Sequence, residues 1–164
     1  MDWNFIDIYS YWAVLKDFIA MDTTRLMQTD MIVRLGFQVL LLVGSAFFSG
    51  SETAMFSLSR LDLQKLRTER NRHSETIHAL LDQPRRLIIS ILCGNELINI
   101  AAAANMTGIL ARLYDVERAG LISTLIMVPL LLLFGEVTPK TIAVSNPVRI
   151  STGVVAAPLS VWVK

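Results

Sequence analysis

The stretch LISTLIMVPLLLLFGEVTPK, residues 121–140, decides the fold because an uncharged apolar run ends in a carboxylate, a proline and a lysine. Residues 121–134 carry no charge and predict a helix that crosses a membrane. Glu136 follows at membrane depth, where an ionisable side chain is costly and marks a candidate functional site. The stretch therefore predicts a membrane protein and one of its polar sites together.

Pro139 adds an argument about the backbone of the same helix. In an α-helix the N–H of residue 139 would donate to the carbonyl of Gly135, but proline has no N–H. A carbonyl freed within a membrane needs another helix, water or a bound ion as its partner. A carboxylate beside a free carbonyl predicts a site for a hard cation. Lys140 has two interpretations, which are snorkelling to the headgroups and gating.

The composition agrees with a membrane protein. The 164-residue chain is 53% hydrophobic, with a mean hydropathy of +0.51 and a net charge of +1. Its single cysteine, Cys93, excludes an internal disulfide framework and a multi-cysteine metal site. His73 and His78 lie outside the predicted spans, so we assign them a structural or solvent-facing role. The chain has no nucleotide-binding glycine loop, and we expect no nucleic-acid partner.

The hydropathy pattern predicts an all-α membrane protein whose transmembrane domain covers residues 31–147. Three transmembrane helices are expected at about residues 31–58, 87–111 and 119–144, the last stopping near Asn146-Pro147. Residues 60–86 predict a juxtamembrane helical hairpin with a break at Gln83-Pro84. Residues 1–30 are interpreted as an N-terminal amphipathic or interfacial segment. Residues 148–164 predict a C-terminal interfacial helix, and the alternative is a truncated fourth span.

The charges of the loops predict how the chain is oriented in the plasma (inner) membrane. Seven Lys and Arg residues lie between the first two spans, but only Arg112 and Arg118 lie between the second and the third. Basic loops stay on the cytoplasmic side of a membrane. The pattern predicts a multi-pass protein with its N-terminus outside and its C-terminus in the cytoplasm.

Each predicted span carries side chains or carbonyls that could bind a cation through oxygen. Residues at i, i+4 and i+7 share one face of a helix, and this spacing recurs in the first span. Hydroxyl, amide, carboxylate and carbonyl oxygens suit magnesium, calcium or sodium, whereas soft metals call for Cys or clustered His. The candidates are Ser45, Ser49, Ser51 and Glu52 in the first span, Asn95, Glu96 and Asn99 in the second, and Gly135 and Glu136 in the third.

Most of these residues also have a purely structural interpretation. Ser45 and Ser49 could allow close packing of helices or bond back to their own helix. The two asparagines could join helices by hydrogen bonds. Glu52 and Glu96 could lie near the bilayer edges or pair with a lysine. Glu136 has the strongest functional interpretation, because it lies beside the carbonyl that Pro139 is expected to free.

Three ordered motifs in these spans resemble the transmembrane domain of the cyclin M/CorC family of magnesium transporters. They are FFSGSETA (residues 47–54), GNELIN (residues 94–99) and FGEVTPK (residues 134–140), and the resemblance covers roughly residues 35–147. It implies a homodimer whose protomers each have three membrane helices, with juxtamembrane helices after the first and an interfacial belt after the third. Members of the family continue into cytoplasmic CBS domains, which this chain does not contain. Either the chain is an excised membrane domain or the regulatory part is absent, and its end inside an apolar segment favours excision.

The resemblance also implies an activity and a set of ligands. It implies a magnesium site within the membrane and magnesium efflux coupled to sodium entry. Ser45 and Ser49 would supply hydroxyls, Asn95 an amide oxygen, Gly135 its carbonyl and Glu136 its carboxylate. Asn99 is a second-rank ligand, and Ser51, Glu52 or Glu96 are second-rank candidates for sodium or coupling. Pro139 and Lys140 are candidates for a helix break and for gating.

Two other functions compete with a transporter. A membrane regulator that senses magnesium and controls a separate transporter would share the site but carry no flux. An intramembrane hydrolase using Ser49 or Ser51 would need a His or Lys base at the same depth, and no His lies in the spans. We therefore expect a magnesium transporter and not an enzyme.

Overall fold

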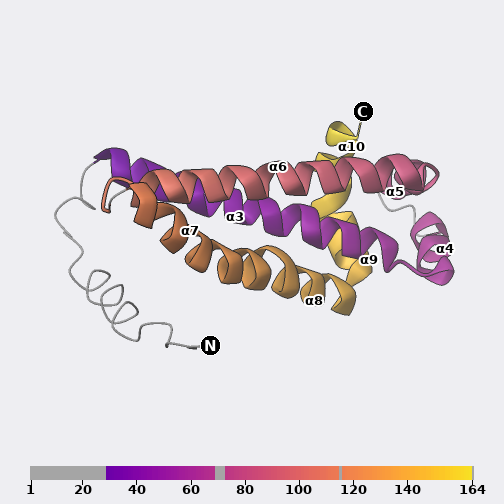
Figure 1. Ribbon diagram of the computed structural model, residues 1–164. Helices are drawn as coiled ribbons and strands as arrows, with labels where there is room; N and C mark the ends of the chain where they lie inside the picture. The colour runs from indigo at the N-terminus through magenta and orange to yellow at the C-terminus, as the bar shows by residue number, and fades with distance from the viewer. Residues whose placement is uncertain (1–28, 69–72, 115, 164) are drawn as a thin grey trace, which may run out of the picture.

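Three long helices form the body of the molecule (Figure 1). The computed structural model describes residues 29–68, 73–114 and 116–163, and every element within these ranges is a helix. The helices long and apolar enough to cross a membrane are α3 (Thr29–Phe56), α6 (Pro84–Leu110) and a continuous third helix over Arg118–Ser145. The third combines α7 (Val116–Leu130), the π-helix η1 (Leu131–Val137) and α8 (Thr138–Ser145). The predicted all-α fold with three membrane-spanning helices is confirmed.

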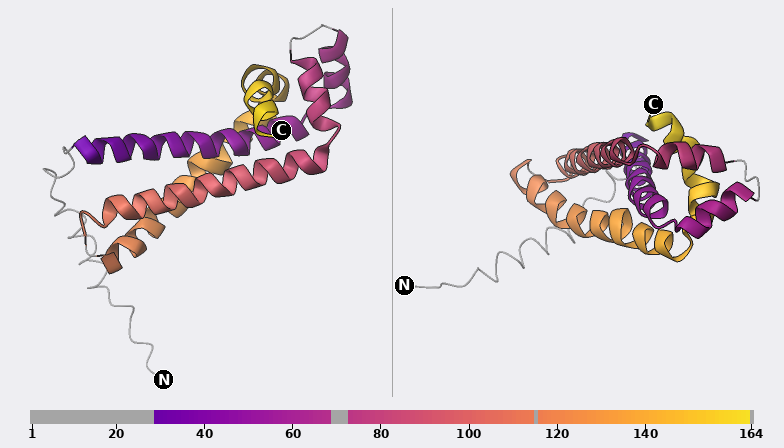
Figure 2. Two further views of the ribbon diagram at one scale, coloured as in Figure 1. Left: turned by 90° about the horizontal axis from the view of Figure 1, so that it is seen from above. Right: turned by 90° about the vertical axis from the view of Figure 1, so that its right-hand side faces the viewer.

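The shorter helices gather at one end of α3 and α6. The hairpin consists of α4 (Arg60–Thr68) and α5 (Ser74–Leu81). The chain after the third spanning helix forms α9 (Pro147–Ile150), η2 (Ser151–Val155) and α10 (Ala156–Trp162). These last three elements, here called the belt, turn across the same end of the molecule beside the hairpin (Figure 2). We call this the hairpin end and the other the far end.

Two predicted boundaries need comment. The hairpin was expected over residues 60–86, but α6 already begins at Pro84, because the fixed φ of proline suits the first turn of a helix. Arg85 and Arg86 therefore belong to the spanning helix α6. The predicted interfacial segment of residues 1–30 falls outside the described residues, except for Thr29 and Asp30, which begin α3.

The belt packs on the protein. Val155, Ala156 and Leu159 are buried, and they join a core that α3, α5 and α6 also build. The Trp162 ring N–H donates to the carbonyl of Ser90 in α6 at 2.8 Å. The same ring packs edge to face on Phe48, with centroids 5.3 Å apart. The belt is not among the three helices able to cross a membrane, and these contacts favour the interfacial interpretation over a fourth span.

The spanning helices approach each other closely at glycines. A Cβ on Gly94 of α6 would lie 2.6 Å from the Phe48 ring of α3. A Cβ on Gly135 of η1 would lie 2.7 Å from Ser45 Oγ, also on α3. Small residues let helix backbones pack tightly where lipid offers no hydrophobic drive for association. Gly94 and Gly135 therefore fix how α3 meets its two partners.

Large apolar side chains cover the outward faces of the three helices. Such a surface suits lipid tails and would be unusual on a soluble domain. It identifies the bilayer as the surroundings of the protein. Examples are Val39, Leu40 and Val43 on α3, Leu92, Leu97 and Ile100 on α6, and Leu121, Leu125 and Leu132 on the third helix.

A capping box begins the hairpin. The backbone N–H of Asp62 donates to Ser59 Oγ at 3.1 Å, and the Asp62 carboxylate accepts from the Ser59 N–H at 3.0 Å. Ser59 Oγ also donates to that carboxylate at 2.6 Å. Hydrogen bonds from Ser59 lower the pKa of Asp62 below 3.8. The exchange satisfies backbone groups at the start of α4 that the helix itself cannot pair.

This capping box predicts a pH dependence of the hairpin. Because the pKa of Asp62 is lowered in the folded chain, its contribution to stability is present above pH 3.8 and is lost as the pH falls through the folded pKa. We expect the first turn of α4 to lose protection from amide exchange in this acid range. Asp62→Asn should lack that acid step when compared at matched pH, and an unchanged step in the variant would contradict the assignment.

Candidate functional site

Ser45 lies at the centre of the predicted polar cluster. Its side chain is fully buried, and its hydroxyl donates to Asn99 Oδ1 at 2.7 Å. Asn95 Oδ1, one turn along α6, lies 3.4 Å from the same hydroxyl. With a rise of about 1.5 Å per residue, Ser45 is about 16 Å from the C-terminal residue of α3, deep within the span. Two helices thus bring three polar oxygens together at membrane depth.

Gly135 brings the third spanning helix to the same place. Its backbone is buried, and the position of a Cβ there lies 2.7 Å from Ser45 Oγ. Any larger residue would push the two helices apart or turn the serine away. The residues predicted in three separate spans, Ser45, Asn95 and Gly135, therefore meet, and Asn99 meets them as well.

Ser49 continues this face one turn closer to the hairpin end. Its hydroxyl is buried and has no hydrogen-bond partner among the described residues. A buried hydroxyl without a partner costs about 1–3 kcal/mol, so such groups are rare unless something binds them. An unpaired oxygen beside the Ser45 cluster fits the binding of a hydrated or partly hydrated cation.

The third helix does not break at Pro139 as predicted. Residues Leu131–Val137 form a π-helix, and the Thr138 N–H bonds to the carbonyl of Leu133, five residues back. The α-helical spacing that was assumed for the carbonyl of Gly135 is therefore not the spacing observed immediately before Pro139. Pro139 itself occupies the first turn of α8. π-Bulges often lie at functional sites, because they redirect the backbone.

Glu136 follows Gly135 and is half-buried. Its carboxylate has no hydrogen-bond or ion-pair partner within the part of the chain that the structure describes. Glu136 is therefore adjacent to the cluster through Gly135, and no hydrogen bond among the described residues joins it to Ser45, Asn95 or Asn99.

Glu52 and Lys140 form an ion pair on the hairpin side of this face. Their charged atoms are 3.8 Å apart, and both side chains are partly exposed. Of the interpretations given for Glu52, pairing with a lysine is the one observed. Ser51 is buried and donates to the carbonyl of Phe47 in its own helix at 2.6 Å. The Ser51 hydroxyl is thus used within α3, as serines in helices often are.

Glu96 does not join the cluster. It is exposed on the outward face of α6, although it neighbours Asn95 in sequence. A step of one residue turns a helix by about 100°, which separates the two side chains. Among the described residues no group of three or more His, Cys, Asp or Glu side chains could hold a metal ion. Any cation site here therefore depends on neutral oxygens with few charges.

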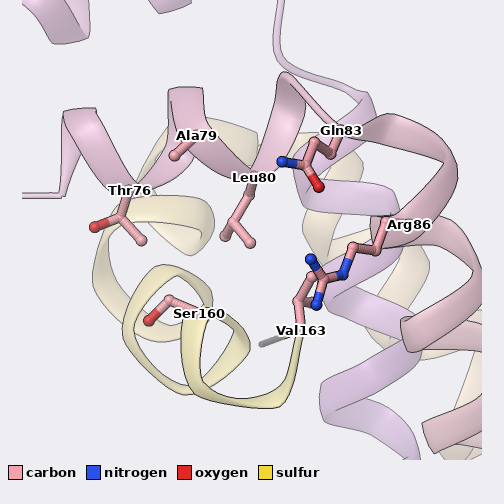
Figure 3. Close-up of a pocket in the computed structure, with 7 residues that line it drawn as sticks. All are labelled: Thr76, Ala79, Leu80, Gln83, Arg86, Ser160 and Val163. Atoms are coloured by element: carbon pink, nitrogen blue, oxygen red, sulfur yellow. The ribbon is translucent and has the colours of Figure 1, made fainter.

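A cavity of about 360 Å³ lies elsewhere, between α5, the start of α6 and α10 (Figure 3). It contains none of the predicted site residues, and its polar groups come from α5, the start of α6 and the belt. We do not assign it to the cation site. Its lining residues are Thr76, Ala79, Leu80, Gln83, Arg86, Ser160 and Val163.

Some polar residues escaped the sequence analysis. Ser151 of the belt is fully buried, and its hydroxyl lacks a partner among the described residues. Gln38 is 4% exposed and bonds to Asn105 across α3 and α6. Gln38 lies seven residues before Ser45, so the same i, i+7 spacing could have identified it.

Comparison with known proteins agrees with this architecture. Residues 36–164 match the model of the family described as the cyclin M transmembrane N-terminal domain. The chain belongs to the cyclin M transmembrane-domain family. The predicted resemblance is thereby confirmed, and the chain is a multi-pass membrane domain of that family.

Several curated relatives share this domain. The UPF0053 inner membrane protein YfjD of Escherichia coli is 40% identical over 119 residues, which cover 71% of this chain and 28% of the relative. A UPF0053 protein of Haemophilus influenzae is 37% identical over 113 residues, covering 69% and 27%. A chloroplastic DUF21 domain-containing protein of Arabidopsis thaliana is 32% identical over 111 residues, covering 68% and 17%. The chain thus matches less than a third of the length of these relatives.

The contact between Gly135 and Ser45 gives a direct prediction. Gly135→Ala places a Cβ 2.7 Å from Ser45 Oγ, so we expect a loss of about 1–3 kcal/mol in stability. Thermal unfolding in detergent measures this loss. Gly120→Ala is the matched control, because no heavy atom lies within 4 Å of a Cβ there. Equal melting temperatures for the two variants would show that the close approach is absent.

Proposed function

We propose that this chain is the membrane domain of a magnesium transporter that exports the ion in exchange for sodium entry. The observation that carries the proposal is the meeting of Ser45, Asn99, Asn95 and Gly135 from three spanning helices. Magnesium prefers oxygen ligands and keeps several of its waters, so a site of neutral oxygens with one carboxylate suits it. The unpaired Ser49 hydroxyl adds a further oxygen donor.

The proposed ligands contribute different oxygen atoms, and one of them contributes a negative charge. Ser45 and Ser49 offer hydroxyls, Asn95 and Asn99 offer amide oxygens, and the backbone at Gly135 offers a carbonyl. Glu136 supplies the charge that offsets part of the cost of removing water from the ion. The Ser45 hydroxyl now donates to Asn99, and it would turn that proton away when a cation binds.

Transport then requires that the site open to each side of the membrane in turn. We place the hairpin end in the cytoplasm of an inner membrane, because the basic residues of the hairpin lie there. On that side the Glu52–Lys140 ion pair lies between the site and the end of the spans. Breaking this exposed pair would cost little, which suits a contact that must open repeatedly. Sodium would compete for the same oxygens.

We also propose that the chain forms a homodimer. Glu96 is exposed on a helix face that also presents Leu92, Cys93 and Ile100. A carboxylate that faces lipid at this depth is costly, so such groups usually face another helix. A second copy of α6 would cover Glu96 and leave apolar side chains of the third helix facing lipid.

The dimer can be tested with the native cysteine. If the Cys93 faces of two protomers meet, a short bifunctional maleimide should link the reconstituted protein into a dimer. Cys93→Ser should abolish the product. A parent protein that stays monomeric on a denaturing gel at every reagent length would contradict an interface on this face of α6.

Transport itself is tested by magnesium flux from loaded proteoliposomes, with and without an opposing sodium gradient. Glu136→Gln and Asn95→Ala should each reduce the initial rate by about tenfold or more, because the first removes the negative charge of the site and the second removes an oxygen ligand. The matched control is Thr141→Val, since Thr141 is exposed and its hydroxyl bonds to its own helix. Its flux should equal that of the parent protein.

Each result of this assay decides between functions. A flux that the sodium gradient accelerates supports an exchanger, and a flux independent of sodium contradicts the coupling. Magnesium binding without flux would overturn the transporter and favour the alternative of a magnesium-sensing regulator. Equal rates in Glu136→Gln and the parent would remove Glu136 from the site.

A further inference from the structure

An apolar layer separates the Ser45 cluster from the far end of the spans. It is built by Leu41, Ala102 and Met127, one from each spanning helix, which are 9%, 0% and 2% exposed. Leu41 lies one turn before Ser45 on α3, on the side away from the hairpin. A hydrated cation at Ser45 could not cross this layer, because apolar side chains that are close-packed exclude water.

A pair of amides lies directly beyond the layer. Asn105 of α6 donates to Gln38 Oε1 at 2.8 Å and to the Arg34 carbonyl at 3.1 Å. These bonds join α3 to α6. Gln38 in turn donates to the Met127 sulfur of the third helix at 3.3 Å. The three spanning helices therefore meet through polar contacts on the far side of the layer.

The bond to Met127 is the weak one of this group. A thioether sulfur is a poor acceptor, so the buried Gln38 amide gains less from it than from a carbonyl or water. The contact between α3 and the third helix is thus easier to break than the amide pair between α3 and α6. At the far end, Thr107 of α6 donates to Ser123 of α7 at 2.9 Å and holds the beginning of the third helix in place.

We propose that Gln38, Leu41, Asn105 and Met127 form the outer gate of the transporter, closed in this structure. The inference rests on the proposed function and on the orientation given there, and it adds the residues that control exit. The gate opens when the part of the third helix between Ser123 and the π-helix bends outward and takes Met127 away from Leu41 and Gln38. The amides of Gln38 and Asn105 then face the path and offer oxygens to the departing ion.

The π-helix explains how Met127 could move while the part of the third helix beside the Ser45 cluster stays in place. Residues Leu131–Val137 lie between Met127 of the gate and Pro139, which packs against Gly50 of α3. Helices commonly bend at π-bulges, where the hydrogen bonds depart from the α pattern. The gate half of the third helix can therefore move while α8 stays on α3.

The gate can be tested by measuring how fast an external reagent modifies a cysteine placed just inside it. Leu131 packs against the layer, and its side chain lies 3.6 Å from the position of a Cβ on Gly135. In a Cys93→Ser background, Leu131→Cys is exposed to a membrane-impermeant cationic thiosulfonate added to spheroplasts, where only the outer face is reachable. With the gate intact, we expect modification to be slow.

Two variants weaken the gate in different ways. Met127→Ala removes the side chain that fills the layer, and Gln38→Ala removes the amide but keeps Met127. Each should accelerate modification of the Leu131→Cys thiol by about tenfold or more, since each removes buried contacts of the closed state. Val128→Ala is the matched control, because Val128 is 55% exposed on the lipid side of the same helix. Its rate should match the background.

The modification rates test the gate independently of magnesium transport. Unchanged modification rates in both gate variants, each eluting as a folded protein in size-exclusion chromatography, would overturn the gate even if the parent transports magnesium. Acceleration in both variants, with the control unchanged, supports the gate. If both variants accelerate modification but the parent carries no magnesium flux, the four residues still form a barrier to the reagent, and the proposal of magnesium transport is contradicted.

Discussion

The close approach of Gly135 to Ser45 is the contact on which the rest of the structure depends. Only glycine lets the third spanning helix come near enough to α3 for its backbone to reach a hydroxyl that also bonds to Asn99. Without this contact the polar groups of three helices would be three separate costs of burial. With it they become one cluster, and the Ser49 hydroxyl one turn away remains available to a ligand.

Different kinds of contact lie between the site and the two ends of the molecule. On the hairpin side, Lys140 pairs with Glu52 in a contact that is partly exposed to solvent. On the far side, a packed apolar layer and a partly buried pair of amides are proposed to close the path. One exit is thus held by exposed charges and the other by packing, and a π-helix in the third helix lies between site and layer. This asymmetry suits a carrier that opens one side at a time.

Sequence reasoning predicted the three spans and named the polar residues that meet around Ser45, because uncharged runs and helical spacing carry that information locally. It ranked Asn99 below Asn95, since two amides one turn apart share a face and only the packed structure shows which lies nearer Ser45. It assumed an α-helical register before Pro139, where the structure has a π-helix that packs against α3 at Gly135. It missed the contact between Gln38 and Asn105, because the pairing of residues far apart in sequence needs the neighbouring helices to be known.

The most direct test of the central claim is to replace the hydroxyl oxygen of Ser45 by sulfur and to measure which metal ion the variant then binds. In a Cys93→Ser background, Ser45→Cys should bind cadmium, because soft thiolates select soft metals, and should show an ultraviolet thiolate-to-cadmium absorption band. The account predicts that this band appears in Ser45→Cys and is weakened when Asn95→Ala removes a second ligand of the same site. A band that Asn95→Ala leaves unchanged, or no band in the folded protein, would contradict a cation site at Ser45.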